Sequence, residues 1–368
     1  MSIVMRKGIE GLRPYPPGKP IEEVQREFGV KRVVKLASNE NLHGPSPRAL
    51  HAVRKMLEQG NYYPDANVYI LGHKLTRKLK IPPEQILFGN GSDDIVTLIC
   101  MTFLEPHHNI VISDYAFIRY KMNADVIGAK VKTVPMKDYY HDVKSLAAAV
   151  DSNTKILFMD NPNNPLGTSV GKKDVEYLLE NVPSHVLVVI DEAYKEYVTC
   201  RDYPHNSIAL LKHYKNLMLL RTFSKAYGLA GFRIGYAMSD AYLIQAVLRV
   251  KPPFNVNAIA QAAAIGALDD IQHIKKTVAG NTTEKQRLYK ELKRLRLKCL
   301  PSDANFITIH VGDAAAVSTA LMMQGVIVRP LAGFGLKEFI RVTIGRPQDN
   351  TWFLKALRTI LKSGGMTE

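Results

Sequence analysis

Cysteine is scarce in this chain of 368 residues, and long apolar runs are missing. The three cysteines, Cys100, Cys200 and Cys299, are odd in number and far apart, which excludes a disulfide framework and a CxxC metal or redox site. The 11 histidines show no metal-ligand spacing, so we expect no protein-bound metal. No stretch approaches the roughly 20 apolar residues of a membrane helix, and the first residues lack the apolar core of a secretory signal. We therefore expect a cytoplasmic protein.

The formal net charge of +15 is the most unusual feature of the composition. A basic chain can bind nucleic acid, a membrane surface or an anionic ligand. The basic residues are dispersed, however, and the densest run, at 285–298, alternates with leucine at helical spacing, which is typical of a solvated helix face. No zinc-finger, helix-turn-helix or RNA-binding aromatic pattern accompanies it. We therefore expect no nucleic-acid or membrane partner.

Short apolar runs alternate with helical segments between residues 85 and 255. Such runs, bounded by polar residues, glycine or proline, are typical of strands buried on both faces. Their alternation with helices predicts an α/β fold with a mainly parallel sheet, whose ligand site lies beyond the carboxyl ends of the strands. The predicted strands are QILFG, NIVISD, KILFMD, VLVVID and NLMLLRTF.

Three segments follow from these patterns. Residues 1–35 are rich in proline and include one short amphipathic stretch, which predicts an arm and a helix packed on the small domain or on a partner subunit. Residues 36–255 form the large domain. Residues 256–368 combine long helical stretches with short strands and a last helix, which predicts a smaller α+β domain.

A glycine-rich turn follows the strand QILF and precedes an apolar helix. Gly91, Ser92 and Asp93 lie in this turn. Glycine lets the backbone come close to a ligand and Ser92 is a suitable N-cap, so the N–H groups of this helix start can bind an anion. An ordinary capped helix start is the alternative, and a P-loop is excluded because no GK[ST] follows.

Charged residues follow two other strands. Asp191 ends the strand VLVVID, and a carboxylate there is either an ion-pair partner or a group that holds a cationic ligand atom. Lys225 follows NLMLLRTF, near hydroxyl groups and Arg233, where a lysine can have a lowered pKa and act as an amine nucleophile. A single lysine is more often exposed to solvent, so the combination of these residues indicates the site.

The order of these motifs resembles that of the fold type I pyridoxal-phosphate aminotransferases over nearly the whole chain. It comprises GNGSDD, NPNNPLG at 161–167, DEAY and TFSKAYGLAGFRIGY, with Asp191 and Lys225 separated by 34 positions. More narrowly, the segments LASNENLHGPSP, NYYPD, YAFIRY, SDANFI and EFIRVTIG look like the histidinol-phosphate aminotransferase branch.

The resemblance implies a homodimer with shared active sites that bind pyridoxal 5′-phosphate. Lys225 would hold the cofactor covalently and carry protons, and Asp191 would pair with its ring nitrogen. Tyr194 and Asn164 would bind the 3′ oxygen of the ring, and Phe117 would stack on its face. The phosphate would be held by Gly91, Ser92, Asp93, Thr222, Ser224, Arg233 and Tyr63 of the partner subunit.

The resemblance also implies two substrate arginines. Arg341 would bind the carboxylate of glutamate or the phosphate of histidinol phosphate, with Arg329 as a second phosphate partner, because a guanidinium group pairs with either anion. Asn39 and Asn305 would line the substrate side, and Tyr15 would close over the site. Surface ion pairs for the arginines and loop-capping amides for the asparagines are the alternatives.

Two departures from the family pattern bear on the substrate. Leu166 replaces the usual threonine of NPNNPLG, and NENLHG replaces NENPLG at the entrance of the substrate pocket. The second change leaves an aromatic amino-acid aminotransferase open as an alternative. A phosphoamino-acid decarboxylase of the same fold is also open, because the sequence does not show how the Cα–carboxylate bond of the substrate is oriented to the cofactor ring. A DNA-binding regulator is a further alternative, although residues 1–35 are too short for a DNA-binding domain. We expect the reversible conversion of L-histidinol phosphate and 2-oxoglutarate to imidazole-acetol phosphate and L-glutamate, a step of histidine biosynthesis.

Overall fold

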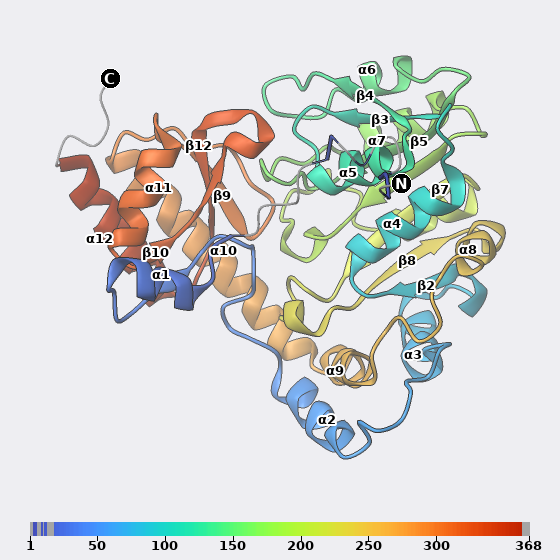
Figure 1. Cartoon of the computed structure of the whole chain (residues 1–368), viewed down its shortest axis with the longest axis horizontal. Helices are drawn as coiled ribbons and strands as arrows, with labels where there is room; N and C mark the ends of the chain where they lie inside the picture. Colours follow the sequence, from blue (N-terminus) through green and yellow to red (C-terminus); the bar gives the residue numbers. More distant parts are fainter. Residues whose placement is uncertain (1–2, 6–8, 10, 13–17, 363–368) are drawn as a thin grey trace.

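A large α/β unit and a smaller α+β unit are joined by α10 (Ile271–Arg294), a long helix that runs from one to the other in Figure 1. The structure is a computed structural model that describes residues 3–5, 9, 11–12 and 18–362. Tyr15, expected to close over the active site, lies outside the described residues. Within the described ranges, no helix is both long enough and apolar enough to cross a membrane.

Among the described residues, seven strands form the sheet of the large unit, in the order β2-β8-β7-β6-β5-β3-β4. The neighbours from β7 to β4 pair in parallel, and β8 is antiparallel to both β2 and β7, which confirms the predicted mainly parallel sheet. The sequence pattern does not predict β4, an edge strand rich in lysine, or β8, which has small residues in place of an apolar run. The strands are β2 (Ile86–Gly89), β3 (Asn109–Ser113), β4 (Lys130–Val134), β5 (Thr154–Asp160), β6 (Leu187–Asp191), β7 (Leu217–Thr222) and β8 (Gly235–Ser239).

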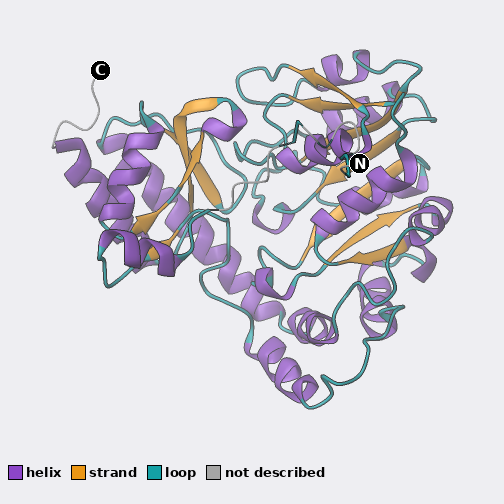
Figure 2. Ribbon diagram, in the orientation of Figure 1, coloured by secondary structure: helices purple, strands orange, loops and turns teal. Residues whose placement is uncertain are grey.

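Helices cover both faces of this sheet (Figure 2). Along β6, Leu187 and Val189 belong to one apolar cluster, whereas Val188 and Ile190 belong to the other. Burial on both faces explains why the central strands are continuous apolar runs. The helices of one face are α4 (Ser92–Phe103), α5 (Ile118–Ile127) and α8 (Ala241–Leu248), and those of the other are α3 (Tyr69–Leu79), α6 (Val143–Ala148), α7 (Lys172–Asn181) and α9 (Ala258–Leu268).

The small unit contains an antiparallel sheet in the order β11-β12-β9 and a parallel pair, β1 with β10. Its apolar core includes Leu36, Leu288 and Phe353, which come from three distant parts of the chain. Its elements are α1 (Ile21–Phe28), β1 (Val34–Lys35), β9 (Phe306–His310), α11 (Ala314–Met323), β10 (Val326–Ile327), β11 (Arg329–Leu331), β12 (Leu336–Thr343) and α12 (Pro347–Lys362).

The packing of α9 and β1 bears on the domain boundaries. Helix α9 contributes Ala260, Ala263 and Leu268 to the core of the large unit, although it follows residue 255. Strand β1 pairs with the small unit. We therefore propose that the large domain extends to Leu268 and that the segment up to β1 belongs with the small domain.

The register of the parallel strands positions the site. Asp160, the last residue of β5, lies opposite Asp191, the last residue of β6, and Asp191 lies opposite Leu220 of β7. Because in-register residues of neighbouring parallel strands point to the same side, the polar residues that end these strands meet at one edge of the sheet.

Helix α9 packs closely on α2 (Pro47–Leu57) at Gly266. A Cβ atom at Gly266 would lie 2.5 Å from the backbone oxygen of Arg48, whereas one at Gly280 of α10 would meet only the side chain of His43, at 3.6 Å. We expect Gly266→Ala to lower the free energy of unfolding by about 1–3 kcal/mol through overpacking. The matched Gly280→Ala should raise it by about 0.5–1 kcal/mol through helix propensity. Urea unfolding of the two variants measures both effects, and equal effects of the same sign would contradict this packing.

Candidate active site

A cavity of about 380 Å³ lies at the carboxyl ends of β5, β6 and β7. This is the edge of the sheet at which a ligand is expected. It brings together side chains from motifs that are far apart in the sequence. Residues expected from the sequence that line it are Ser92, Asp93, Phe117, Asn164, Asp191, Tyr194, Thr222, Ser224, Lys225 and Arg233.

Lys225 follows β7 and is partly buried. Its Nζ donates a hydrogen bond to the backbone oxygen of Ser38 (3.2 Å) and lies 5.6 Å from the ring centre of Tyr194. Burial, followed by the positive charge of Arg341, lowers the pKa of Lys225 to about 8. A fraction of this lysine is therefore neutral near neutral pH, and the neutral amine is the nucleophilic form.

The carboxylate of Asp191 is buried at the end of β6. Its Oδ2 accepts a hydrogen bond from the Tyr120 hydroxyl (3.1 Å), and its Oδ1 accepts one from the N–H of Ala193 (3.1 Å). Burial, together with the nearby charge of Glu192, raises the pKa of Asp191 to about 6. Because both donors are neutral, this carboxylate can pair with a cationic atom of a ligand.

The hydroxyl of Tyr194 is positioned by Asn39. Asn39 Nδ2 donates to Tyr194 Oη (3.0 Å), while the Asn39 N–H donates to Thr343 Oγ1 (2.9 Å) and its backbone oxygen accepts from Asn305 Nδ2 (3.0 Å). Asn39 and Asn305, expected on the substrate side, thus lie behind Tyr194 and not among the residues that line the cavity. Burial raises the pKa of Tyr194 to about 12, so the tyrosine keeps its proton and can donate it to a ligand oxygen.

Helix α4 begins at the wall of the cavity. The expectation that Ser92 is its N-cap is wrong, because the N-cap is Gly91 and Ser92 is the first helical residue. Gly91 has φ +89°, and a Cβ there would lie 2.4 Å from Arg233 Nη2, so a side chain would displace the guanidinium group. Ser92 at the helix start and Arg233 line the same cavity as Thr222 and Ser224, and this set of donors could hold an anion.

The carboxylate of Asp93 has a partner of its own. Its Oδ1 accepts a hydrogen bond from Arg119 Nε (2.7 Å). Because a carboxylate repels an anion, the group of Asp93 that can face a phosphate is its backbone N–H.

Arg341 extends from the small unit toward the cavity. It lies on β12 and is buried, and its guanidinium group donates to Asn164 Oδ1 and to the backbone oxygen of Ala37 (2.9 Å). Arg329 lies opposite Arg341 on β11, and neither arginine is among the residues that line the cavity. Arg341 reaches the edge of the site through its contact with Asn164, which does line the cavity, and Arg329 lies beside Arg341 on the neighbouring strand.

Tyr63 does not line the cavity of its own chain. Its side chain is 82% exposed and stacks on Phe254, with 4.8 Å between ring centres. This position agrees with the expectation from the resemblance that Tyr63 binds the cofactor phosphate of the partner subunit and not that of its own chain.

Sequence reasoning missed three polar residues of the cavity, Ser38, Glu40 and Asp160. Asp160 could have been found, because KILFMD ends in a carboxylate just as VLVVID does. Ser38 and Glu40 lie in the segment between the two units, where no strand or helix pattern indicates which side chains face a cavity.

The donor set fits pyridoxal phosphate. The protonated ring nitrogen would pair with the carboxylate of Asp191, and the phosphate would bind at the start of α4 and to Arg233. The aldehyde would react with the amine of Lys225. In the described part of the chain, no group of three or more His, Cys, Asp or Glu side chains is arranged to hold a metal ion.

Comparison with known proteins gives a consistent result. Residues 31–357 match the model of the family "Aminotransferase class I and II". The chain is 45% identical over 356 residues to histidinol-phosphate aminotransferase 1 of Nitrosococcus oceani, covering 96% of each chain. It is 45% identical to the histidinol-phosphate aminotransferase of Moorella thermoacetica, over 97% of this chain and 92% of that one. The crystal structure of histidinol-phosphate aminotransferase from Sinorhizobium meliloti in complex with pyridoxal-5′-phosphate superimposes with a TM-score of 0.89, at 29% identity and 98% coverage of both chains.

The buried carboxyl group of Asp160 predicts a pH dependence of stability in the cofactor-free protein. Burial, together with the neighbouring charge of Asp191, raises the pKa of Asp160 to about 7, whereas an unfolded aspartate has a pKa of about 3.9. Between these values the folded state binds more protons, so the free energy of unfolding falls as pH rises. Asp160→Asn removes this fall. The free energy of unfolding of the variant minus that of wild type should therefore increase between about pH 5 and about pH 7.5.

Asp142→Asn is the control for this experiment. Hydrogen bonds from Lys137 and Ser145 lower the pKa of Asp142 to about 2, so its contribution is complete above the unfolded pKa and constant over the tested range. Urea unfolding at both pH values gives the difference for each variant. A constant difference between Asp160→Asn and wild type would contradict the raised pKa.

Proposed function

The chain belongs to the aminotransferase class I and II family, and we propose that it transfers the amino group of L-histidinol phosphate to 2-oxoglutarate, with pyridoxal 5′-phosphate as cofactor. The products are imidazole-acetol phosphate and L-glutamate, the reaction is reversible, and it is a step of histidine biosynthesis. The observation that carries the proposal is the joint presence, in one cavity, of Lys225, Asp191 and the anion site at α4, with Arg341 beside them.

When bound, pyridoxal phosphate supplies an electron sink for the carbon that carries the amino group. Lys225 Nζ is the group that would hold the cofactor and would move a proton to and from that carbon. Both tasks need the neutral amine, and burial and Arg341 favour the neutral form.

Asp191 and Tyr194 would orient the cofactor ring. Asp191 would keep the ring nitrogen protonated, and the hydroxyl of Tyr120 fixes the orientation of the Asp191 carboxylate. Tyr194 would donate a hydrogen bond to the 3′ oxygen, because Asn39 already occupies one acceptor site of its hydroxyl. Phe117, at the start of α5, lines the cavity and would cover one face of the ring.

Arg341 binds the anionic group of each substrate in turn. The carboxylate of 2-oxoglutarate and the phosphate of histidinol phosphate both accept parallel hydrogen bonds from a guanidinium group. The contact of Arg341 with Asn164 supports this role, because Asn164 lines the cavity. Arg329, on the neighbouring strand, is the second phosphate partner.

We further propose a homodimer in which Tyr63 of the partner subunit reaches the cofactor phosphate. The exposure of Tyr63 and of its neighbours Tyr62, Tyr69 and Ile70 supports this, because so many large apolar side chains on one surface indicate an interface. A solution mass of one chain, 41.2 kDa, measured by light scattering would contradict the dimer.

We infer a cytoplasmic location from the soluble phosphorylated substrates of the reaction.

The aromatic amino-acid aminotransferase and the phosphoamino-acid decarboxylase are less well supported. The relatives that match at 45% identity over nearly the whole chain are histidinol-phosphate aminotransferases. The buried guanidinium of Arg341 is a better partner for a substrate with an anionic group at its far end than for a substrate with an aromatic ring there.

Replacing Arg341 tests the substrate assignment. Arg341→Ala should lower kcat/KM for histidinol phosphate and for 2-oxoglutarate by about 100-fold or more, because both anions lose the same buried cation. Arg341→Lys should recover part of the loss, since lysine keeps the charge and loses the paired hydrogen bonds. Arg346→Ala, which removes an exposed arginine paired with Asp349, is the control and should change kcat/KM by less than about twofold. Unchanged values in Arg341→Ala would remove Arg341 from the site.

A further inference from the structure

A second buried carboxyl group lies next to Asp191, and the mechanism above gives it no part. Asp160 ends β5, its Cα is the register partner of Asp191, and its side chain lines the cavity with 3% of the residue exposed. Burying a carboxyl group costs free energy unless hydrogen bonds compensate for its lost hydration, so the partners of Asp160 indicate what it does.

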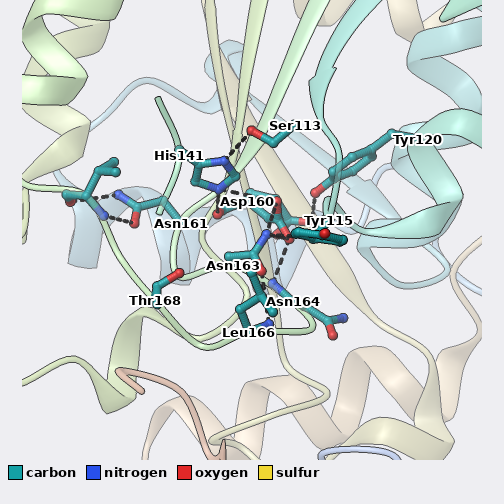
Figure 3. A network of polar contacts seen from close by, with 12 residues as sticks. Ser113, Tyr115, Tyr120, His141, Asp160, Asn161, Asn163, Asn164, Leu166 and Thr168 are labelled. Atoms are coloured by element: carbon teal, nitrogen blue, oxygen red, sulfur yellow. Dashed lines mark hydrogen bonds and ion pairs between the residues drawn. The ribbon is translucent and has the colours of Figure 1, made fainter. Parts of the chain in front are cut away.

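Asp160 holds the turn that carries Asn164. The N–H of Asn164 donates to Asp160 Oδ2 (2.7 Å), and Asn163 Nδ2 lies 3.2 Å and 3.3 Å from the two carboxyl oxygens (Figure 3). Asn163 Nδ2 also donates to the backbone oxygen of Tyr115 (3.1 Å). The turn NPNNPLG therefore starts from a carboxyl group that accepts from both a backbone and a side-chain donor.

His141 holds the backbone of Asp160 from the other side (Figure 3). Its Nε2 lies 2.9 Å from the backbone oxygen of Asp160, which can only accept, so Nε2 carries the hydrogen. Nδ1 then accepts from the Ser113 hydroxyl (2.7 Å). Burial lowers the pKa of His141 to about 4, so the ring is neutral and anchors Asp160 without a charge.

The side chain of Asn164 lies between the two halves of the proposed site. Its Oδ1 accepts from the guanidinium of Arg341, which leaves Nδ2 to donate to the 3′ oxygen of the cofactor. An amide with one end on Arg341 and the other on the cofactor works only if its backbone is fixed, and the short bond to Asp160 fixes it.

We propose that Asp160 is a positioning residue of the transamination site: its carboxyl group, as acceptor of the Asn164 N–H, fixes the amide that holds both Arg341 and the cofactor. The proposal rests on the proposed function. The acceptor oxygen matters and the negative charge does not, because the donors are Asn164, Asn163 and, through the backbone, a neutral histidine. An asparagine in place of Asp160 can still present an oxygen to Asn164.

The test compares three variants as holoenzymes. Asp160→Ala removes the acceptor, Asp160→Asn keeps it, and Thr168→Val is the matched control, because Thr168 is buried in the same turn and donates one hydrogen bond, to the backbone oxygen of Tyr139 (2.7 Å). Two quantities are measured: the KM values for histidinol phosphate and 2-oxoglutarate, and the pH midpoint of the visible absorbance of bound pyridoxal phosphate.

Asp160→Ala should raise both KM values about tenfold, with a smaller change in kcat, because Arg341 loses its fixed partner. It should also displace the pH midpoint of the cofactor absorbance by about half a unit or more, the equivalent of one weak hydrogen bond. Asp160→Asn and Thr168→Val should stay within about twofold of wild type in both KM values. If Asp160→Ala does not fold, Asp160→Ser replaces it, since its oxygen lies one bond closer to the backbone than the carboxyl oxygens, and the same changes are expected.

Two results would overturn the proposal. Equal impairment in Asp160→Asn and Asp160→Ala would assign the effect to charge, and equal behaviour of Asp160→Ala and Thr168→Val would reduce Asp160 to a structural part of the turn. Failure of the wild-type enzyme to use histidinol phosphate would instead defeat the proposed function. The pH midpoint would still report on Asp160 in that case, because it is measured on the cofactor without substrate.

Discussion

The parallel register of β5, β6 and β7 is the constraint on which the site depends. It places Asp160 opposite Asp191 and brings the segment after β7, with Lys225, to the same edge of the sheet. Strands β5 and β6 are both apolar runs that end in a carboxylate, so a shift that drew Asp160 or Asp191 into the apolar interior of the sheet would bury an unpaired carboxylate at a high cost in free energy. The same apolar packing that stabilises the large unit therefore sets the distances among the charged groups of the cavity.

Two basic side chains, Lys225 and Arg341, and two buried carboxyl groups, Asp160 and Asp191, lie in or next to the cavity. Burial and the positive charge of Arg341 lower the pKa of Lys225. Burial raises the pKa values of Asp160 and Asp191 above that of a free aspartate, with a further contribution from Asp191 for Asp160 and from Glu192 for Asp191. A cofactor with a cationic ring nitrogen and an anionic phosphate would offset both imbalances. Its binding would stabilise the ionised carboxylate of Asp191, and Lys225 would supply the neutral amine that the proposed reaction needs.

Much of this arrangement could be predicted from the sequence, and the limits have physical causes. Lys225 and Asp191 could be found because each follows a continuous apolar strand, a pattern that local sequence carries. The positions of Asn39 and Asn305 could not, because both amides are used in long-range hydrogen bonds behind Tyr194. The N-cap at Gly91 was missed since serine is the commoner cap, and here the close approach of Arg233 requires glycine. The carboxylate of Asp160 could have been found in the same way as that of Asp191, because it ends the apolar run KILFMD, but its contacts with the turn and with His141 could not, since no sequence spacing indicates them.

The most direct test of the central claim is a titration of the visible absorbance of the holoenzyme with L-histidinol phosphate, L-histidinol and L-phenylalanine. The first two differ only in the phosphate group that Arg341 is proposed to bind. We predict loss of the cofactor band at a concentration of histidinol phosphate about 100-fold or more below that of the other two amines. Equal or stronger bleaching by phenylalanine would contradict the substrate assignment, and a protein that does not take up pyridoxal phosphate at all would contradict the whole account.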